Sequence, residues 1–337
     1  MSKAVSRAVR VALTVAIIAG LVLFARTVNW SQTWQHITGA NRTILLAAAI
    51  VNLLSLVIKG VRWWIFLRPV GVPSLWLALR ATFAGAGLNN ILVANGGEAA
   101  RVVFVARTAH VQSARILASL ALERMFELVG YLVMFVLVAS FLELPPRLEF
   151  ARPFAWVALL LAVVLMIYLV RRPHLDDVQM PERKAEGWRG RVGEFFRHFA
   201  TTVGGISTGP RFMVALALSI ANVGMQVWTY ALTARAANFN LSLVGTVSAL
   251  LAVNLGFAIR ATPGNVGVFQ ALYALVATAF GMDRDQALAV ALLIQTQQII
   301  PVTLLGVALA PEFIFKRRGR RAVDSGLDLR SRAEEFG

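Results

Sequence analysis

Apolar runs recur along the chain and are separated by short polar stretches. A helix that crosses the hydrocarbon core of a bilayer, about 30 Å thick, needs about 20 mostly apolar residues. Several runs approach this length with few internal charges, so the pattern predicts membrane-spanning helices. The predicted spans are Val9–Ala25, Thr43–Ile58, Leu128–Leu142 extended backward to about Ile116, Pro153–Val170, Phe212–Ala234 and Gln286–Ala310.

Two further apolar segments, Leu75–Arg101 and Leu241–Gly281, are interrupted by glycine and polar residues, and the second also by proline. As one helix, the second segment of roughly 40 residues would extend ~60 Å, about twice the thickness of the bilayer core. It must therefore reverse, as a re-entrant hairpin or as two full crossings at Leu243–Ile259 and Val266–Phe280. The first segment lies between two basic stretches, so we expect it to enter and leave on one side. The pattern predicts an all-α, polytopic membrane bundle of about eight transmembrane segments, including these two broken helices.

The two interruptions resemble each other in sequence. "ILVANGGE" at Ile91–Glu98 aligns with "AIRATPGN" at Ala258–Asn265. Paired broken helices that approach the bilayer midplane from opposite faces are typical of secondary transporters with inverted repeats. The alignment predicts such a repeat, and a chance match of two short segments is the alternative.

The second interruption has the composition of a helix break. Pro263 lacks a backbone N–H, and Gly264 and Gly267 permit a tight turn or a close backbone approach. We expect a new helix to start near Asn265 as N-cap, with the amides of about Val266 to Val268 unpaired and suited to an anion such as a phosphate. Arg260 precedes the break, and an arginine at bilayer depth costs ~2.5–3.5 kcal/mol unless it finds a partner, water or an anionic ligand. Alternatively, Arg260 extends to a membrane interface between two full crossings.

The first interruption carries charged residues directly after its glycines. Gly96 and Gly97 interrupt the helix, Glu98 lies in the first turn of the next one, and Arg101 follows on the same face. Glu98 is a candidate for binding a ligand or relaying a proton. It is equally explained as a carboxylate that stabilises the start of its own helix.

A third polar group, "LERMFE", lies within or beside a predicted span. Glu123 and Glu127 are one helical turn apart, and Arg124 lies three residues before Glu127. Charges inside a membrane segment neutralise one another or face a polar pathway. Together with Arg62, this group places several cations and carboxylates in a mostly apolar bundle.

Composition excludes several classes of function. Of the 337 residues, 58% are hydrophobic, none is cysteine, and the four histidines are scattered, so we expect no metal site and no cofactor. The net charge of +16 is more typical of loops that face anionic lipid than of a nucleic-acid-binding protein. Because the chain lacks a nucleotide-binding or catalytic motif, we expect no enzymatic activity.

Basic residues predict the orientation and the domain organisation. They gather at the N-terminus, after the second span, in 171–211 and in the tail, so we place both termini in the cytoplasm. We expect one transmembrane domain over residues 1–315, with an uncleaved first helix rather than a signal peptide. The 171–211 loop contains "WRGRVGEFFRHFATTV", which predicts an amphipathic helix at the membrane surface or a packed cap. Residues 316–337 form a basic tail that we expect to be disordered.

The chain resembles the lysylphosphatidylglycerol synthase transmembrane, or flippase-like, family. The resemblance rests on Arg62 and on three blocks, "NNILVANGGEAAR", "LASLALERMFELVG" and "TPGNVGVFQA", in this order over nearly the whole chain. It implies a bacterial inner-membrane protein that moves, or helps to move, an amphipathic lipid between leaflets. Two departures are Val93 with Ala94, where a proline is usual, and Gln270, where a glutamate is common. The motif positions that the resemblance carries over are Arg62, Asn90, Gly97, Glu98, Arg101, Glu123, Arg124, Pro263, Gly264 and Gly267.

These patterns lead to one main hypothesis and two alternatives. We expect a lipid translocase whose partners are membrane lipids of anionic, glycolipid or isoprenoid type, with lipid-synthesis enzymes nearby. Arg62, Arg101, Arg124 and Arg260 would bind an anionic headgroup near the two helix breaks, with Glu127 among the residues of the site. The alternatives are a membrane-embedded enzyme that transfers a glycosyl or acyl group, with Glu98, Glu123 or Glu127 as base, and an accessory or scaffold subunit of a lipid-synthesis system.

Overall fold

The protein is described from a computed structural model that covers residues 26, 28–91, 96–144, 146, 149–171, 209–256 and 265–309. Every regular element in these residues is helical. The expected first span, the amphipathic helix of the 171–211 loop, the tail, and Arg260, Pro263 and Gly264 lie outside the described residues. The elements are α2 (Trp30–Thr38), α3 (Arg42–Leu67), the short 3-10 helix η1 (Arg68–Val70), α4 (Leu75–Ile91), α5 (Gly96–Thr108), α6 (Ser113–Phe141), α7 (Ala151–Arg171), α9 (Gly209–Ala236), α10 (Leu243–Gly256), α11 (Val268–Ala279) and α12 (Arg284–Leu309).

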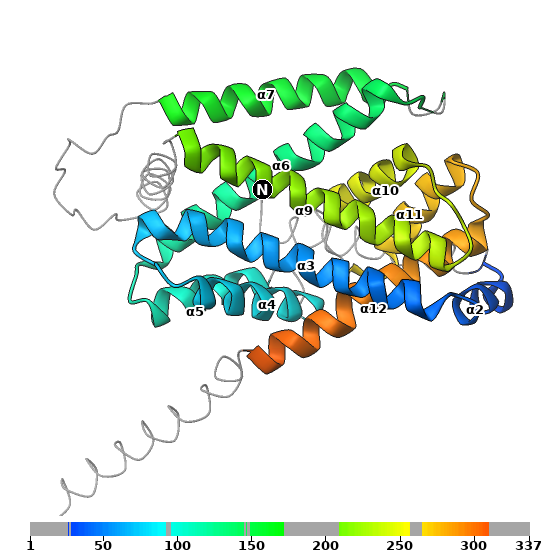
Figure 1. Ribbon diagram of the computed structural model, residues 1–337, viewed down its shortest axis with the longest axis horizontal. Coiled ribbons are helices and arrows are strands. Elements are labelled where there is room, and N and C mark those ends of the chain that lie inside the picture. The colour runs from blue at the N-terminus through cyan, green and yellow to red at the C-terminus, as the bar shows by residue number, and fades with distance from the viewer. Residues whose placement is uncertain are drawn as a thin grey trace, which may run out of the picture.

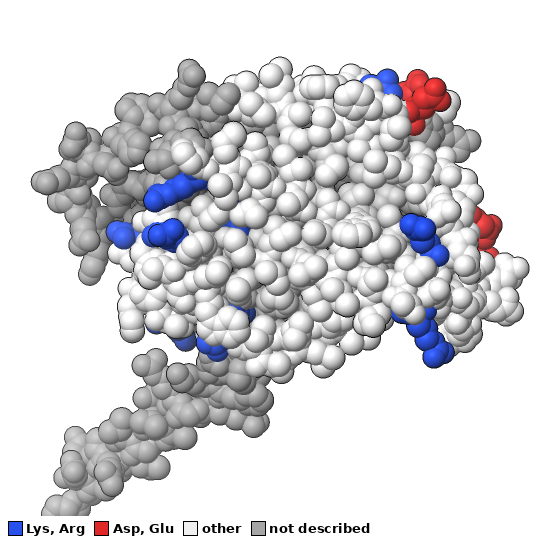
Figure 2. Space-filling view, viewed as in Figure 1, with Lys and Arg blue, Asp and Glu red and all other residues white. Residues whose placement is uncertain are grey.

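The prediction of a polytopic helical membrane protein is confirmed. By length and composition, α3, α6, α9 and α12 are each able to cross a membrane, and α7 begins with an apolar stretch at Ala151–Leu165. On the face in Figure 2, charged side chains gather toward the two ends of the long axis and leave a broad uncharged surface between them. Such a surface suits the hydrocarbon core of a bilayer.

The second predicted span is longer than its apolar run. Helix α3 starts at the N-cap Asn41, whose side chain accepts a hydrogen bond from the Thr43 amide at 3.0 Å, and it ends only at Leu67. Lys59 and Arg62, which the sequence placed after the span in the cytoplasm, lie inside this helix. That placement was wrong, because carboxylates from another helix neutralise both charges within the bundle.

Each interrupted segment forms a pair of short helices that pack against each other. Helices α4 and α5 form the first hairpin, and α10 and α11 form the second. At 1.5 Å per residue, helices of 17, 13, 14 and 12 residues extend only about 18–26 Å. Because a crossing helix needs about 30 Å, these lengths favour re-entrant hairpins over pairs of full crossings.

The two hairpins enter the bundle from opposite ends (Figure 1). Helix α4 is antiparallel to α12, since Arg80 near its start donates to the Leu309 carbonyl at 2.7 Å, and Asn90 near its end donates to the Gln298 carbonyl at 3.2 Å. The end of α9 and the start of α12 lie together at the other end of the bundle. There the Gln286 side chain donates a hydrogen bond to the Ala237 carbonyl at 3.2 Å. The second hairpin starts there, directly after α9.

The two halves of the bundle have the same order of elements, which is the arrangement that an inverted repeat requires. Each half consists of a long helix, a hairpin and a second long helix, in the order α3, first hairpin, α6 and then α9, second hairpin, α12. Helices α3 and α9 are antiparallel, because the Asn41 amide bonds to the Ala236 carbonyl at 2.8 Å while Arg62 bonds to Ser219 at 2.9 Å. Equivalent elements therefore run in opposite directions.

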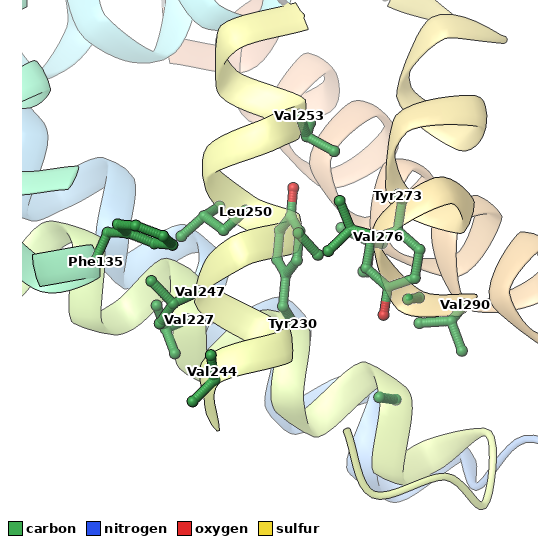
Figure 3. Close-up of a cluster of buried hydrophobic side chains, with 14 of the residues drawn as sticks. Phe135, Val227, Tyr230, Val244, Val247, Leu250, Val253, Tyr273, Val276 and Val290 are labelled. Carbon is green, nitrogen blue, oxygen red and sulfur yellow. The ribbon is translucent and has the colours of Figure 1, made fainter. Parts of the chain in front are cut away.

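Each hairpin has its own apolar core. One cluster packs the first hairpin against the end of α3 and the start of α6, with Trp63, Phe66 and Phe126 fully buried. The other packs the second hairpin against α6, α9 and α12, where Tyr230 and Tyr273 lie 5.9 Å apart between ring centres (Figure 3). Helix α6 contributes to both cores, its first part to one and its second part to the other.

Candidate functional site

A cavity of about 360 Å³ lies between the two hairpin cores. Asn89 and Asn90 at the end of α4 line it, as do Asn254 at the end of α10 and Asn265 just before α11. The residues that flank both helix breaks therefore meet at one cavity, which we call the central cavity. Its full lining is Asn52, Ser55, Leu56, Lys59, Ala86, Asn89, Asn90, Arg124, Glu127, Leu128, Tyr131, Asn222, Gln226, Leu251, Asn254, Leu255, Asn265, Gln295, Gln298, Ile299 and Val302.

Side-chain amides dominate the polar part of this lining. Some are held by the protein: Asn90 donates to Thr303 at 3.1 Å, and the Tyr131 hydroxyl lies 2.9 Å from Gln226 and 3.1 Å from Asn254. The nine amide residues are Asn52, Asn89, Asn90, Asn222, Gln226, Asn254, Asn265, Gln295 and Gln298.

Two of these amides are buried and have side-chain atoms that lack a hydrogen-bond partner. Within the described part of the chain, the Asn222 side-chain nitrogen and both polar atoms of the Asn265 side chain have no hydrogen bond, although the two residues are only 1% and 3% exposed. Leaving a buried polar group unpaired costs about 1–3 kcal/mol, and each such group calls for an explanation, such as a bound water or ligand. Because these two side chains also line the cavity, they make the wall a candidate binding surface.

The charged part of the wall is a compact ion-pair network. One carboxylate oxygen of Glu127 lies 3.0 Å from the Lys59 ammonium nitrogen, and the other lies 2.6 Å from a guanidinium nitrogen of Arg124. Arg124 also pairs with Glu98 of the first hairpin, which links that hairpin to α6. The Arg124 side chain is 42% exposed, so it is the most accessible member of the network.

A second set of charges lies behind the wall. Glu123 is fully buried and pairs with Arg101, and its other oxygen lies 3.9 Å from Arg62. Arg62 donates to Ser219 at 2.9 Å, and the Arg101 guanidinium lies 3.8 Å from the ring centre of Trp63, a cation–π contact. None of these charged groups lines the central cavity. They join α3, α5, α6 and α9 directly beside it.

The first break is held by a close contact between its two helices. The Gly97 amide donates to the Asn89 side chain at 2.9 Å, which orients an amide of the cavity wall. A Cβ atom on Gly97 would overlap the Gly85 carbonyl oxygen and lie 2.6 Å from the Asn89 nitrogen. The backbones of α4 and α5 therefore approach closely at Gly97, and only glycine permits this contact.

The second break differs from its prediction. Helix α11 begins at Val268 with Gly267 as N-cap, and not at Asn265. Gly267 has φ +90°, and its amide donates to the Gln270 side chain at 2.6 Å, so Gln270 satisfies a helix-start amide that we expected to be unpaired. Asn265 has φ +56° and contributes its side chain to the cavity wall instead of capping the helix.

The predicted site residues fall into three groups. Asn90, Arg124 and Glu127 line the central cavity. Arg260, Pro263 and Gly264 lie outside the described residues. Five more lie next to the wall, through contacts with lining residues or with one another: Arg62, Gly97, Glu98, Arg101 and Glu123. Gly267 is connected to the wall through Gln270, which donates a hydrogen bond to the lining residue Gln295.

The sequence analysis missed Lys59 and most of the amides. It weighed charges and helix breaks, whereas the signal was polar residues at helical spacing inside apolar runs. Asn222 with Gln226 and Gln295 with Gln298 each share one helix face. Among the described residues, no group of histidine, aspartate and glutamate side chains is arranged to hold a metal ion.

The chain was compared with known proteins and families. Residues 11–306 match the model of the family described as lysylphosphatidylglycerol synthase TM region. This match covers most of the chain and includes every helix at the central cavity. The comparison with curated proteins gave no match.

Proposed function

Because the chain belongs to the lysylphosphatidylglycerol synthase transmembrane family, whose members handle membrane lipids, we propose that it moves an amphipathic lipid between the two leaflets. The lipid headgroup enters the central cavity while the acyl chains stay in the bilayer. Membership supports the association with lipids, and the geometry of the cavity suggests the translocation.

The central cavity is the observation that carries this proposal. A polar headgroup pays a desolvation cost of several kcal/mol in hydrocarbon unless hydrogen bonds replace water. Amides and ion pairs deep in an apolar bundle supply such bonds. The cavity also lies where two oppositely directed hairpins meet, which is the position of the substrate site in transporters built from inverted repeats.

Exposed apolar residues at the cavity give the acyl chains a route. Leu128 and Leu255 line the cavity and are also 46% and 61% exposed on the bundle surface. The cavity wall is therefore continuous with the lipid-facing surface on α6 and α10. The headgroup would form hydrogen bonds inside the cavity, and the acyl chains would lie against these leucines. Each part of the lipid would then be in a favourable environment.

We place the end of α3 on the cytoplasmic side of a bacterial inner membrane. Helices α7 and α12 end at the same end of the bundle (Figure 1), and the basic stretches 171–211 and 316–337 of the sequence continue from them. Loops rich in lysine and arginine favour the cytoplasm. The C-terminus is then cytoplasmic, and the first span expected from the sequence, Val9–Ala25, would place the N-terminus on the same side.

The proposal is tested by reconstituting the purified protein into phosphatidylethanolamine–phosphatidylglycerol vesicles. Trace lipids with a fluorophore on an acyl chain are bleached from outside by dithionite, with and without an imposed proton gradient. In protein-free vesicles about half of the fluorescence is protected, and we expect the protein to abolish this protection for at least one headgroup. Glu127→Gln, which removes the carboxylate that holds Lys59 and Arg124, should slow this loss at least tenfold, while the exposed Glu143→Gln should not.

Two results would contradict translocation. Full protection of every labelled lipid under both conditions would leave an accessory role as the explanation. Conversion of a lipid into a new product, visible by thin-layer chromatography and lost in Glu127→Gln, would favour a lipid-modifying enzyme, because Glu127 is the one carboxylate in the described cavity wall.

A further inference from the structure

We propose that the headgroup taken by the central cavity is neutral and polyhydroxylated, that is, a sugar or similar polyol carried on a lipid. This proposal rests on the proposed function, since it names the class of cargo for the same cavity. It replaces the anionic headgroup expected from the sequence. Three features of the wall carry it: paired cations, amides with both donors and acceptors, and a carboxylate.

The cations of the described cavity wall already have partners. Lys59 and Arg124 both bind Glu127, and Arg124 binds Glu98 as well. A phosphate bound to either cation would lie beside the carboxylate that the cation already binds. Because like charges repel strongly in a site of low dielectric constant, this arrangement disfavours an anion.

The amides favour a group that both donates and accepts hydrogen bonds. A carboxamide offers an N–H₂ donor and a carbonyl acceptor, and each hydroxyl of a sugar has a donor and acceptor lone pairs to match them. An ionised phosphate only accepts, so it would leave the carbonyl oxygens of the wall unpaired. Asn265 has both its donor and its acceptor without partners in the described part of the chain. A hydroxyl group, which both donates and accepts, would satisfy both of these atoms.

The positions of the unpaired amides fit a ligand of headgroup size. Asn222 lies on α9 and Asn265 lies before α11, so a single ligand in the cavity is approached from both elements. Glu127 on α6 adds acceptor lone pairs for further hydroxyls. A volume of about 360 Å³ is near the lower end of the ~300–1,000 Å³ range of ligand pockets, which suits a headgroup without its acyl chains.

The test measures binding to the purified full chain in a detergent that has no sugar headgroup. Four probes are titrated by calorimetry: dihexanoyl glucosylglycerol, dihexanoyl phosphatidylglycerol, dihexanoyl phosphatidic acid and methyl glucoside. We expect the glucosyl lipid to bind saturably and at least tenfold more tightly than phosphatidic acid. Methyl glucoside should bind at least tenfold more weakly than the glucosyl lipid, because it lacks the acyl chains that lie along Leu128 and Leu255.

Variants connect this binding to the cavity. Asn222→Leu removes both hydrogen-bonding groups of the side chain at nearly constant volume. Asn265→Asp removes only the N–H₂ donor, and aspartate tolerates the positive φ of this position. Each should weaken binding of the glucosyl lipid at least tenfold. Ser248→Ala is the matched control, since Ser248 is also buried with an unpartnered hydroxyl but does not line the cavity. If Asn222→Leu does not fold, Asn265→Asp carries the comparison.

The possible failures are distinguishable. Tighter binding of phosphatidic acid or phosphatidylglycerol, or equal binding of the glucosyl lipid by every variant, would overturn the polyol headgroup and leave translocation standing. Equal affinity for methyl glucoside would replace the lipid by a soluble sugar. If no probe binds while the vesicle assay still shows translocation, the headgroup class is wrong. If translocation also fails for every lipid, the proposed function itself fails.

Discussion

Glu123 shows how single residues hold the charged part of the bundle. Its carboxylate is fully buried between Arg62 and Arg101, and Lys59 lies 3.9 Å from the same group. These partners come from α3 and α5, whereas Glu123 belongs to α6. The residue therefore acts as a junction of helices next to the cavity, rather than as a group that contacts a ligand.

Replacing Glu123 by glutamine should destabilise the protein severely. The substitution keeps the shape but leaves Arg62 and Arg101 buried without a counter-charge, and breaking a buried pair in this way costs about 3–5 kcal/mol. The melting temperature of the detergent-solubilised protein measures the effect. Glu143→Gln is the control, because Glu143 is exposed after the end of α6. An unchanged melting temperature in Glu123→Gln would show that the charge of Glu123 does not stabilise the fold.

At the scale of elements, the two hairpins decide where the cavity lies. Each consists of helices too short to cross a bilayer, and each ends at the cavity wall. The first is fixed by the contact of Gly97 with Gly85 and Asn89. Packing of this hairpin therefore sets the position of an amide in the cavity wall.

Gly97→Ala should separate α4 from α5. A methyl group there would overlap backbone atoms, which cannot move as a flexible side chain would, and overpacking of this kind costs about 1–3 kcal/mol or more. We expect a lower melting temperature together with at least tenfold weaker binding of whichever lipid the vesicle assay identifies. Gly224→Ala in α9 is the matched control, since its nearest neighbour would be the Met134 side chain at 3.9 Å. Equal behaviour of the two variants would show that the close approach at Gly97 is dispensable.

For the whole molecule, the important property is the opposite direction of its two halves. The loop between α5 and α6 lies at the end of the bundle where α3 finishes, and the loop between α9 and α10 lies at the other end. The two hairpins thus enter the bundle from opposite ends. We therefore expect each leaflet to have one hairpin that leads to the same cavity.

Cysteine labelling tests this arrangement directly, because the natural chain contains no cysteine. Ser113→Cys and Asn240→Cys are single substitutions at exposed positions in the two loop regions. A membrane-impermeant maleimide applied to intact cells should label Asn240→Cys, whereas Ser113→Cys should react only in inverted membrane vesicles. Labelling of both from the same side would rule out the inverted repeat, and the reverse result would place the termini outside the cytoplasm.

Much of the architecture was predictable because its causes are local. The long spans, the two interruptions and the short resemblance between Ile91–Glu98 and Ala258–Asn265 all follow from composition and spacing over a few turns of helix. The start of α11 was missed, because the capping bond from Gly267 to Gln270 competes with the N-cap role of Asn265. Local rules do not decide between two such caps.

The sequence by itself determined that this is a helical membrane protein with two broken helices and buried charges, because hydrophobic runs, glycines and prolines act on their own neighbourhoods. Only the tertiary structure decided which polar residues form the cavity and which stand behind it. Lys59 and Glu127 form a hydrogen bond although they are 68 residues apart in the sequence, and Arg62 and Ser219 do so at a separation of 157 residues. Contacts of this range depend on how antiparallel helices pack, and no local pattern in the chain specifies that packing.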